Sequence, residues 1–172
     1  STADLVIGVG TRLQDFTTGS RSLFGDAQLF QINVQPFDAH KHSAQAVVGD
    51  AREVLTALRE HLHDWAVAES VLRQDRDAIA QWQQQVDAAT AGGSEQVLPS
   101  DAQVIGAVQA SLDDNAVVVC AAGGLPGELH KLWRASRPGG YHLEYGYSCM
   151  GYEIAGGLGV KMAQPDREVV VM

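Results

Sequence analysis

The chain of 172 residues carries 12 basic and 21 acidic side chains, which sets its formal net charge at −9 and its pI at about 4.9. This acidic balance argues against nucleic acids and anionic membranes as partners, because both attract a basic surface. No apolar run approaches the ~18 residues that a membrane-spanning helix needs. The only cysteines, Cys120 and Cys149, lack metal-type spacing and suit a reducing cytoplasm, where we expect the protein to reside.

The first part of the chain alternates short apolar runs with polar loops. Residues 4–10, 29–34 and 46–48 predict buried strands, and the first of them ends in glycine. Asp50 then predicts the cap of a helix, with Glu53 three residues on as in a capping box. Strands that alternate with loops and a helix indicate a parallel α/β layer.

A second predicted helix covers residues 69–89, and a polar, glycine-rich segment at 91–94 follows it. That segment is the best domain boundary in the chain. The helix has apolar residues at helical spacing, which predict a buried stripe: Leu72, Ile79, Trp82 and Val86.

The last part of the chain has the same strand and helix alternation. Ser100 and Gln103 predict a capped helix, and residues 116–120 predict a buried strand that runs into a glycine-rich turn at 121–127. The remaining predicted elements are a strand at 141–145, a helix that opens at Met150 and Gly151, and an apolar strand at 168–172.

Glycine is costly within that last helix, at about 1 kcal/mol per residue relative to alanine. Gly156, Gly157 and Gly159 together therefore predict a helix packed too closely for side chains.

The chain starts without methionine and stops within a strand, so we expect it to be an internal part of a larger protein. In open α/β sheets ligands bind beyond the carboxyl ends of the strands.

Two glycine motifs have a structural and a functional interpretation. Gly123 and Gly124 lie between a strand and a helix, where exposed N–H groups suit an anion, although a tight turn alone would also need glycine. Gly8 and Gly10 resemble the start of a dinucleotide motif, but the third glycine is absent, so a strand-ending turn is the better interpretation.

Several polar side chains are candidate site residues. His142, Glu144 and Tyr145 alternate on or beside a strand, where His142 and Glu144 are expected to share one face, and they form either a solvated face or a substrate pocket. Ser148 and Cys149 have no partner that would activate a nucleophile. A cluster near residue 40 lacks a further metal ligand and indicates a surface loop: Asp38, His40 and His42.

Together these pieces resemble the thiamine-diphosphate-dependent enzymes of the acetolactate synthase and pyruvate decarboxylase type. The resemblance rests on residues 146–152, then on the small-residue helix at 155–159, then on P-D-R-E-V-V at 165–170. A longer block at 142–153, with 10–18 and 125–134, resembles the branch of this family that hydrolyses a cyclic diketone in inositol breakdown.

The resemblance implies a fold and a domain order. We expect an α/β chain with two partial, Rossmann-like parallel-sheet units, taken from a three-domain thiamine-diphosphate enzyme. Residues 1–65 would form the C-terminal part of the central domain, 66–99 a helical linker, and 100–172 the truncated N-terminal part of the cofactor-binding domain. The intact protein would be a homodimer or homotetramer, and this chain alone would be inactive.

The resemblance also implies site residues. Met150 matches the bulky residue that holds the cofactor bent, and backbone groups at Ser148, Cys149 and Gly151 lie beside it. The turn that holds the diphosphate is matched by Gly123, Gly124 and Leu125. The ligands of Mg²⁺ and the glutamate that protonates the cofactor would lie outside this chain. Residues near Gly10 and Arg12 match a region that touches flavin in acetolactate synthase. Related members of the family lack flavin, so we predict no cofactor at these residues.

Three functions follow as hypotheses. The first is a thiamine-diphosphate- and Mg²⁺-dependent hydrolase that cleaves a C–C bond in a cyclic 1,2-diketone. The second is a decarboxylase or carboligase acting on pyruvate with the same cofactor. The third is a non-catalytic nucleotide-binding module. A substrate panel separates the first two, and titration with nucleotides and thiamine diphosphate separates the third.

Overall fold

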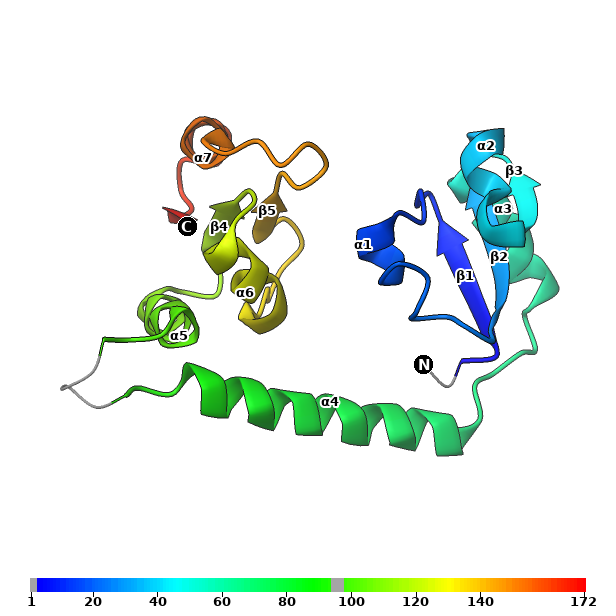
Figure 1. The fold of residues 1–172 in the computed structure, drawn as a ribbon, viewed down its shortest axis with the longest axis horizontal. Coiled ribbons are helices and arrows are strands. Elements are labelled where there is room, and N and C mark those ends of the chain that lie inside the picture. The colour runs from blue at the N-terminus through cyan, green and yellow to red at the C-terminus, as the bar shows by residue number, and fades with distance from the viewer. Residues whose placement is uncertain (1–2, 94–97) are drawn as a thin grey trace. The chain divides into compact units, whose positions relative to one another are not determined.

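Two three-stranded parallel sheets organise the chain in its computed structural model, which describes residues 3–93 and 98–172 (Figure 1). The first sheet has the strand order β1-β2-β3 and the second the order β5-β4-β6. The chain divides into two compact units, Ser1–Val67 and Ala68–Met172, with one sheet in each. The predicted α/β class with two separate parallel sheets is therefore confirmed.

The first unit holds β1 (Leu5–Val9), β2 (Gln28–Asn33) and β3 (Gln45–Val48). The helix predicted after Asp50 is present, and the Asp50 carboxylate accepts the backbone N–H groups of Arg52 at 2.8 Å and Glu53 at 3.4 Å. This cap satisfies amides that have no partner inside the helix. The helices of the unit are α1 (Asp15–Thr18), α2 (Pro36–Ala39), the 3-10 helix η1 (Lys41–Ser43) and α3 (Ala51–His61).

Buried amide side chains fix the loop after β1, a feature that the apolar pattern does not reveal. Gln31 is fully buried, and its Nε2 donates to the Thr11 carbonyl at 2.7 Å. Asn33 Nδ2 donates to the same carbonyl at 2.9 Å. A Cβ on Gly8 would collide with the Gln31 side chain. Gly8 therefore makes room for Gln31, while Gly10 turns the chain with a φ of 65°.

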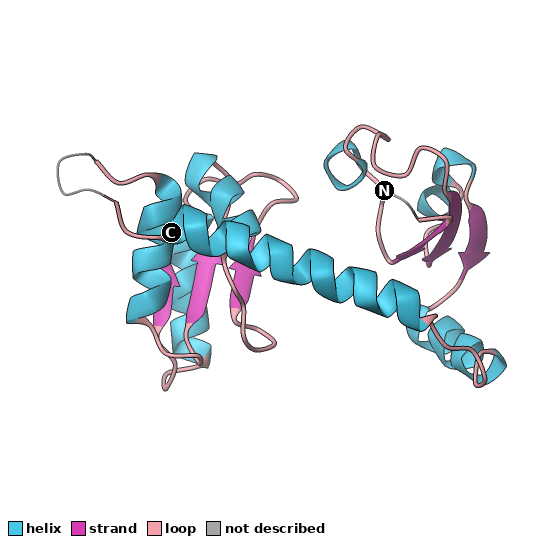
Figure 2. Ribbon diagram, turned by 90° about the horizontal axis from the view of Figure 1, so that it is seen from below, coloured by secondary structure: helices cyan, strands magenta, loops and turns pink. Residues whose placement is uncertain are grey.

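The second unit holds β4 (Val117–Cys120), β5 (Tyr141–Leu143) and β6 (Val169–Val171), which lie side by side in Figure 2. Val118 pairs with Tyr141 on one side and with Val170 on the other, so β4 is the central strand. The strand predicted at 141–145 is shorter than expected. The helices of the unit are α4 (Glu69–Thr90), α5 (Asp101–Ser111), α6 (Gly124–Leu132) and α7 (Tyr152–Ala163).

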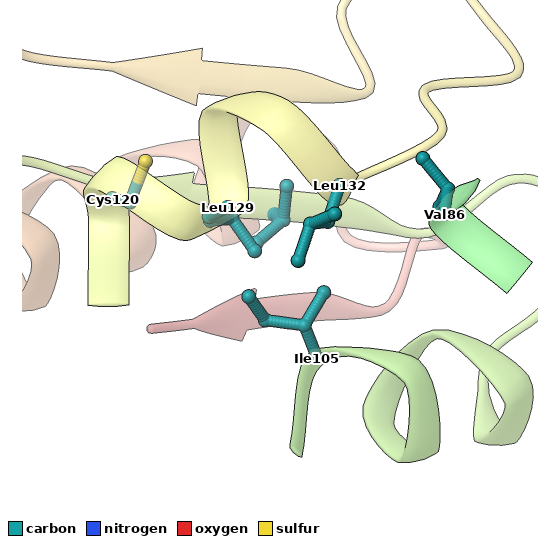
Figure 3. Packing of buried hydrophobic residues seen from close by; sticks show 6 residues of the cluster. Val86, Ile105, Cys120, Leu129 and Leu132 are labelled. Carbon is teal, nitrogen blue, oxygen red and sulfur yellow. The ribbon is translucent and has the colours of Figure 1, made fainter. Parts of the chain in front are cut away.

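One apolar cluster holds this second unit together (Figure 3). Ile105 of α5, Val118 and Cys120 of β4 and Leu129 of α6 are fully buried. Full burial of such a side chain stabilises the fold by about 1.5–3 kcal/mol. The helix that supplies Ile105 begins with the predicted capping box of Ser100 and Gln103.

The predicted buried stripe of α4 is wrong over most of its length. Val86 is buried, whereas Leu72, Ile79 and Trp82 are 39%, 57% and 47% exposed. The reason is that only the C-terminal end of the helix reaches α5, where a Cβ on Gly106 would collide with the Thr90 backbone. Helical periodicity identified the apolar face but not how much of it finds a partner.

The domain boundary expected at 91–94 also differs from the structure, in which the units divide between Val67 and Ala68. Gly92 and Gly93 connect α4 to α5 within the second unit, while Ser94 lies outside the described residues. Packing of α4 on α5 joins the two helices, so a glycine-rich connection does not separate two units here. The assignment of 1–65, 66–99 and 100–172 to parts of family domains stays a prediction.

The close packing predicted for the glycine-rich helix α7 occurs at two of its three glycines. A Cβ on Gly156 would collide with the Tyr152 ring of the same helix. A Cβ on Gly157 would collide with the Val171 side chain of β6, so this glycine lets the helix lie on the strand. Gly159 has open space around it. The apolar residues Ile154, Leu158 and Met162 are 75%, 62% and 76% exposed, so they face away from that contact.

Candidate functional site

Two turns of the second unit meet at one edge of its sheet. β4 and β5 are parallel neighbours, and the backbone N–H of Glu144 donates to the Cys120 carbonyl at 3.1 Å. The turn that follows Cys120 and the turn at 144–151 therefore both leave the carboxyl edge of the sheet. This is the edge at which open α/β sheets bind ligands.

The first turn leads directly into the N-terminus of α6. Its predicted extent, 121–127, is too long, because the helix already begins at Gly124 and Gly127 N–H donates to the Gly123 carbonyl at 3.1 Å. Pro126 fits the first turn of a helix, where its missing N–H is not needed. Gly123 has a φ of 152°, a region that side chains rarely adopt.

The cap residue of this helix is Gly123, which has no side chain to bond to the first amides. A Cβ placed on Gly124 would meet nothing within 4 Å, so the approach to the first amides is open. Unpaired N–H groups at the start of a helix carry partial positive charge and attract anions. The first turn therefore has the chemistry of an anion site.

The second turn is held by a carboxylate. Glu144 follows the last residue of β5, so it belongs to the turn and not to the strand. Its Oε1 accepts the N–H of Tyr147 at 2.9 Å and its Oε2 accepts the N–H of Cys149 at 2.8 Å. The amides of Cys149 and then Tyr147 lower the pKa of Glu144, because they stabilise the charged form.

The same turn places Met150 in an open position. Met150 is 85% exposed, and the next residue, Gly151, has a φ of 92°. Gly151 N–H donates to Glu153 Oε2 at 2.7 Å, and Tyr152 N–H donates to the Cys149 carbonyl at 3.2 Å. A large apolar side chain so exposed is available for contact with a ligand.

Neither thiol fits an activated nucleophile. Desolvation, followed by the nearby charge of Glu144, raises the pKa of Cys149. Cys120 is buried, its Sγ donates to the hydroxyl of Tyr141 at 3.3 Å, and burial raises the pKa of both groups. A reactive cysteine needs the opposite shift toward thiolate.

The predicted polar set does not share one face of a strand. Glu144 lies beyond β5 and bonds to the second turn. His142 lies within β5, where its Nε2 is shielded from solvent without a hydrogen-bond partner in the described part of the chain. The Tyr145 ring packs edge-on against His130 of α6, with ring centroids 5.7 Å apart. Strand alternation failed here because the strand ends at Leu143.

The described residues contain no group of three or more His, Cys, Asp or Glu side chains that would hold a metal ion. Near residue 40, Lys41 forms an ion pair with Asp38 at 2.6 Å, and His42 Nε2 lies 3.0 Å from the Leu13 carbonyl. Over residues 3–93 and 98–172, no helix combines the length and the apolar character that crossing a membrane requires.

Two family models match the chain. Residues 1–58 match "Thiamine pyrophosphate enzyme, central domain", and residues 121–172 match "Thiamine pyrophosphate enzyme, C-terminal TPP binding domain". The second match contains both turns of the candidate site.

Curated relatives match almost the whole chain. A "3D-(3,5/4)-trihydroxycyclohexane-1,2-dione hydrolase" of Geobacillus thermodenitrificans is 42% identical over 99% of this chain. Proteins of the same name from Bacillus cereus and Bacillus anthracis are each 38% identical over 99% of it. The chain spans about 30% of the length of these relatives.

Proposed function

The chain belongs to the thiamine pyrophosphate enzymes, and from this membership we propose that the whole protein is a thiamine-diphosphate- and Mg²⁺-dependent hydrolase. The proposed substrate is trihydroxycyclohexane-1,2-dione, whose ring it opens in inositol breakdown. The substrate half of the proposal is supported by relatives that carry this name and are up to 42% identical over 99% of the chain. The cofactor half is supported by two turns that share the carboxyl edge of one parallel sheet.

The first turn suits the diphosphate group of the cofactor. Gly123, Gly124 and Leu125 supply backbone N–H groups at the start of α6, which has no side-chain cap. The open space above Gly124 leaves room for phosphate oxygens to approach the backbone. We assign these three residues to diphosphate binding.

The second turn suits the ring end of the cofactor. Met150 offers an exposed apolar side chain, and the backbone at Ser148, Cys149 and Gly151 lies beside it. When bound, thiamine diphosphate supplies the nucleophilic carbon and the electron sink that C–C cleavage next to a carbonyl requires. The part proposed for Met150 is to hold the bound group in its reactive shape, which lowers the entropic barrier to reaction.

Polar side chains near the second turn are proposed as the substrate pocket. A polyhydroxylated ring needs hydrogen-bonding groups in its pocket, whereas an apolar wall would serve the methyl group of pyruvate. His142 lies in β5, and Glu144 and Tyr145 are the first two residues of this turn. Their polarity favours the cyclic diketone over pyruvate.

The proposal also includes Mg²⁺, a cytoplasmic location and assembly into a homodimer or homotetramer. Mg²⁺ commonly bridges protein and phosphate oxygens, which is the reason to include it. Two free thiols suit a reducing compartment. The assembly is an expectation from the family resemblance, and sedimentation of the intact protein measures it.

The test is a substrate panel on the purified intact protein with thiamine diphosphate and Mg²⁺. We expect the ring of the cyclic dione to open, which is monitored through the loss of absorbance of the diketone. We expect little conversion of pyruvate to acetolactate. Omission of either cofactor should abolish turnover. Brisk conversion of pyruvate without turnover of the dione would transfer the assignment to a carboligase, and binding of nucleotides without thiamine diphosphate would favour a binding module.

A further inference from the structure

The second turn contains backbone strain that needs an explanation. Ser148 has a φ of 53°, in the left-handed region. A residue other than glycine adopts this region only against steric strain between its Cβ and the backbone. Such strain persists only where surrounding contacts hold the backbone in place. Those contacts lie on both sides of Ser148.

Glu144 supplies them. Its two carboxylate oxygens accept the N–H groups of Tyr147 and Cys149, which flank Ser148 in the chain. The backbone of Glu144 is in turn tied to the end of β4, through its N–H bond to the Cys120 carbonyl. The carboxylate therefore fixes the turn to the rigid sheet, on both sides of its strained residue.

We propose that Glu144 is a positioning residue, whose carboxylate bridges the Tyr147 and Cys149 amides and so sets the turn that presents Met150 before the cofactor arrives. This inference rests on the proposed cofactor role of the turn and deepens it. It gives Glu144 a part in addition to the substrate contact proposed above, because each of its carboxylate oxygens already accepts one amide of the turn.

The physical gain is pre-organisation. A turn already in its bound shape does not lose conformational freedom when the ligand binds, so affinity rises without any new contact. Glu153 completes the arrangement, because its carboxylate accepts the Gly151 N–H on the other side of Met150. Carboxylate-bound amides thus flank Met150 in the chain and fix the backbone from which its exposed side chain extends.

Glu144→Gln is the direct test. Glutamine has one acceptor oxygen and one NH₂ donor, so it can satisfy only one of the two amides and directs a donor at the other. In the intact protein without cofactor, we expect roughly tenfold faster hydrogen–deuterium exchange of the Tyr147 and Cys149 amides, since a hydrogen bond to a charged group is lost. Calorimetry should show roughly tenfold weaker binding of thiamine diphosphate for the same reason.

The matched control is Glu128→Gln on α6. Glu128 has a similar exposed carboxylate, which pairs with Lys131 at 2.7 Å and makes no bond to the turn. Exchange in the turn and cofactor affinity should stay at the wild-type values, because exposed ion pairs contribute little. If Glu144→Gln does not fold, Glu144→Asp serves instead, because its shorter side chain keeps the charge but cannot span both amides.

The outcomes separate this inference from the proposed function. Wild-type exchange and cofactor affinity in Glu144→Gln, with only the KM for the dione raised, would overturn the inference and return Glu144 to the substrate pocket. Faster exchange with wild-type cofactor affinity would also overturn it, because the turn would then not matter for binding. If the wild type binds no thiamine diphosphate, the proposed function fails, and faster exchange of the two amides in Glu144→Gln still identifies the carboxylate bridge.

Discussion

The two turns at the carboxyl edge of the second sheet are built in different ways. The first depends on the backbone freedom of Gly123, a cap residue that has no side chain to hold the turn. The second contains strained Ser148 and is held by hydrogen bonds to Glu144. We therefore expect the first turn to be sensitive to replacement of Gly123 and insensitive to pH. The second turn should depend on the charge of Glu144 and therefore on pH.

Gly123→Ala should have the largest effect, because it attacks the backbone of the first turn. A Cβ at a φ of 152° strains the backbone at a cost of about 1–3 kcal/mol, measured as the loss of unfolding free energy in urea. Affinity for thiamine diphosphate should fall as the amides of the helix start are displaced. The matched control is Gly124→Ala, where a Cβ meets nothing within 4 Å, so stability should change by less than about 0.5 kcal/mol.

Met150→Ala tests what the second turn presents. We expect turnover of the intact enzyme to fall about tenfold, because the reactive groups are less well held together. Stability should change by less than about 0.5 kcal/mol, since Met150 is 85% exposed and contributes little packing. Steady-state kinetics at saturating cofactor and urea denaturation measure the two quantities. A loss of stability without loss of turnover would assign Met150 to the fold instead.

The smallest expected effect is a pH dependence confined to the second turn. Because the pKa of Glu144 lies lower in the folded protein than its usual value of 4.5, its carboxylate stabilises the turn fully above that value. The stabilisation is lost as pH falls through the lowered, folded-state pKa. Amide exchange of Tyr147 and Cys149, corrected for the intrinsic rate, should lose protection in that range.

The first turn and the strands provide the control for this titration. The Gly127 amide donates to the Gly123 carbonyl and not to a titrating side chain, so it should keep its protection over the same pH range. An equal loss of protection in β4 would indicate global unfolding. If the amides of Tyr147 and Cys149 kept their protection over the whole pH range, the contrast between the turns would be contradicted. Glu153 accepts the Gly151 N–H in the same turn, so Glu144→Gln identifies which of the two carboxylates is responsible.

Much of the fold was predictable because it depends on near neighbours in the chain. The capping box of Ser100 and Gln103 involves residues three apart, and the apolar run of β4 indicated burial on both faces of a parallel sheet. The family resemblance is confirmed by the matches at 1–58 and 121–172. Residue by residue, the cofactor assignments stay predictions until binding is measured.

The incorrect predictions share a different physical cause. Periodicity identified the apolar face of α4, but Ile79 and Trp82 are exposed because a pattern does not specify how much of a helix is covered. Strand alternation paired His142 with Glu144, but the strand ends before Glu144. The buried amides of Gln31 and Asn33 gave no signal, since their partner is a backbone carbonyl far along the chain.

Strands, caps and glycine turns could be located from the amino-acid sequence, because they follow from backbone sterics and from hydrogen bonds within a few residues. The shared edge of the two turns and the separate unit Ala68–Met172 became visible only in the folded chain. The folded chain also shows which apolar faces find a partner. Pairing of β4 with β5 joins two segments that are separated in the sequence by α6 and its flanking turns. Burial likewise depends on surfaces that distant segments supply.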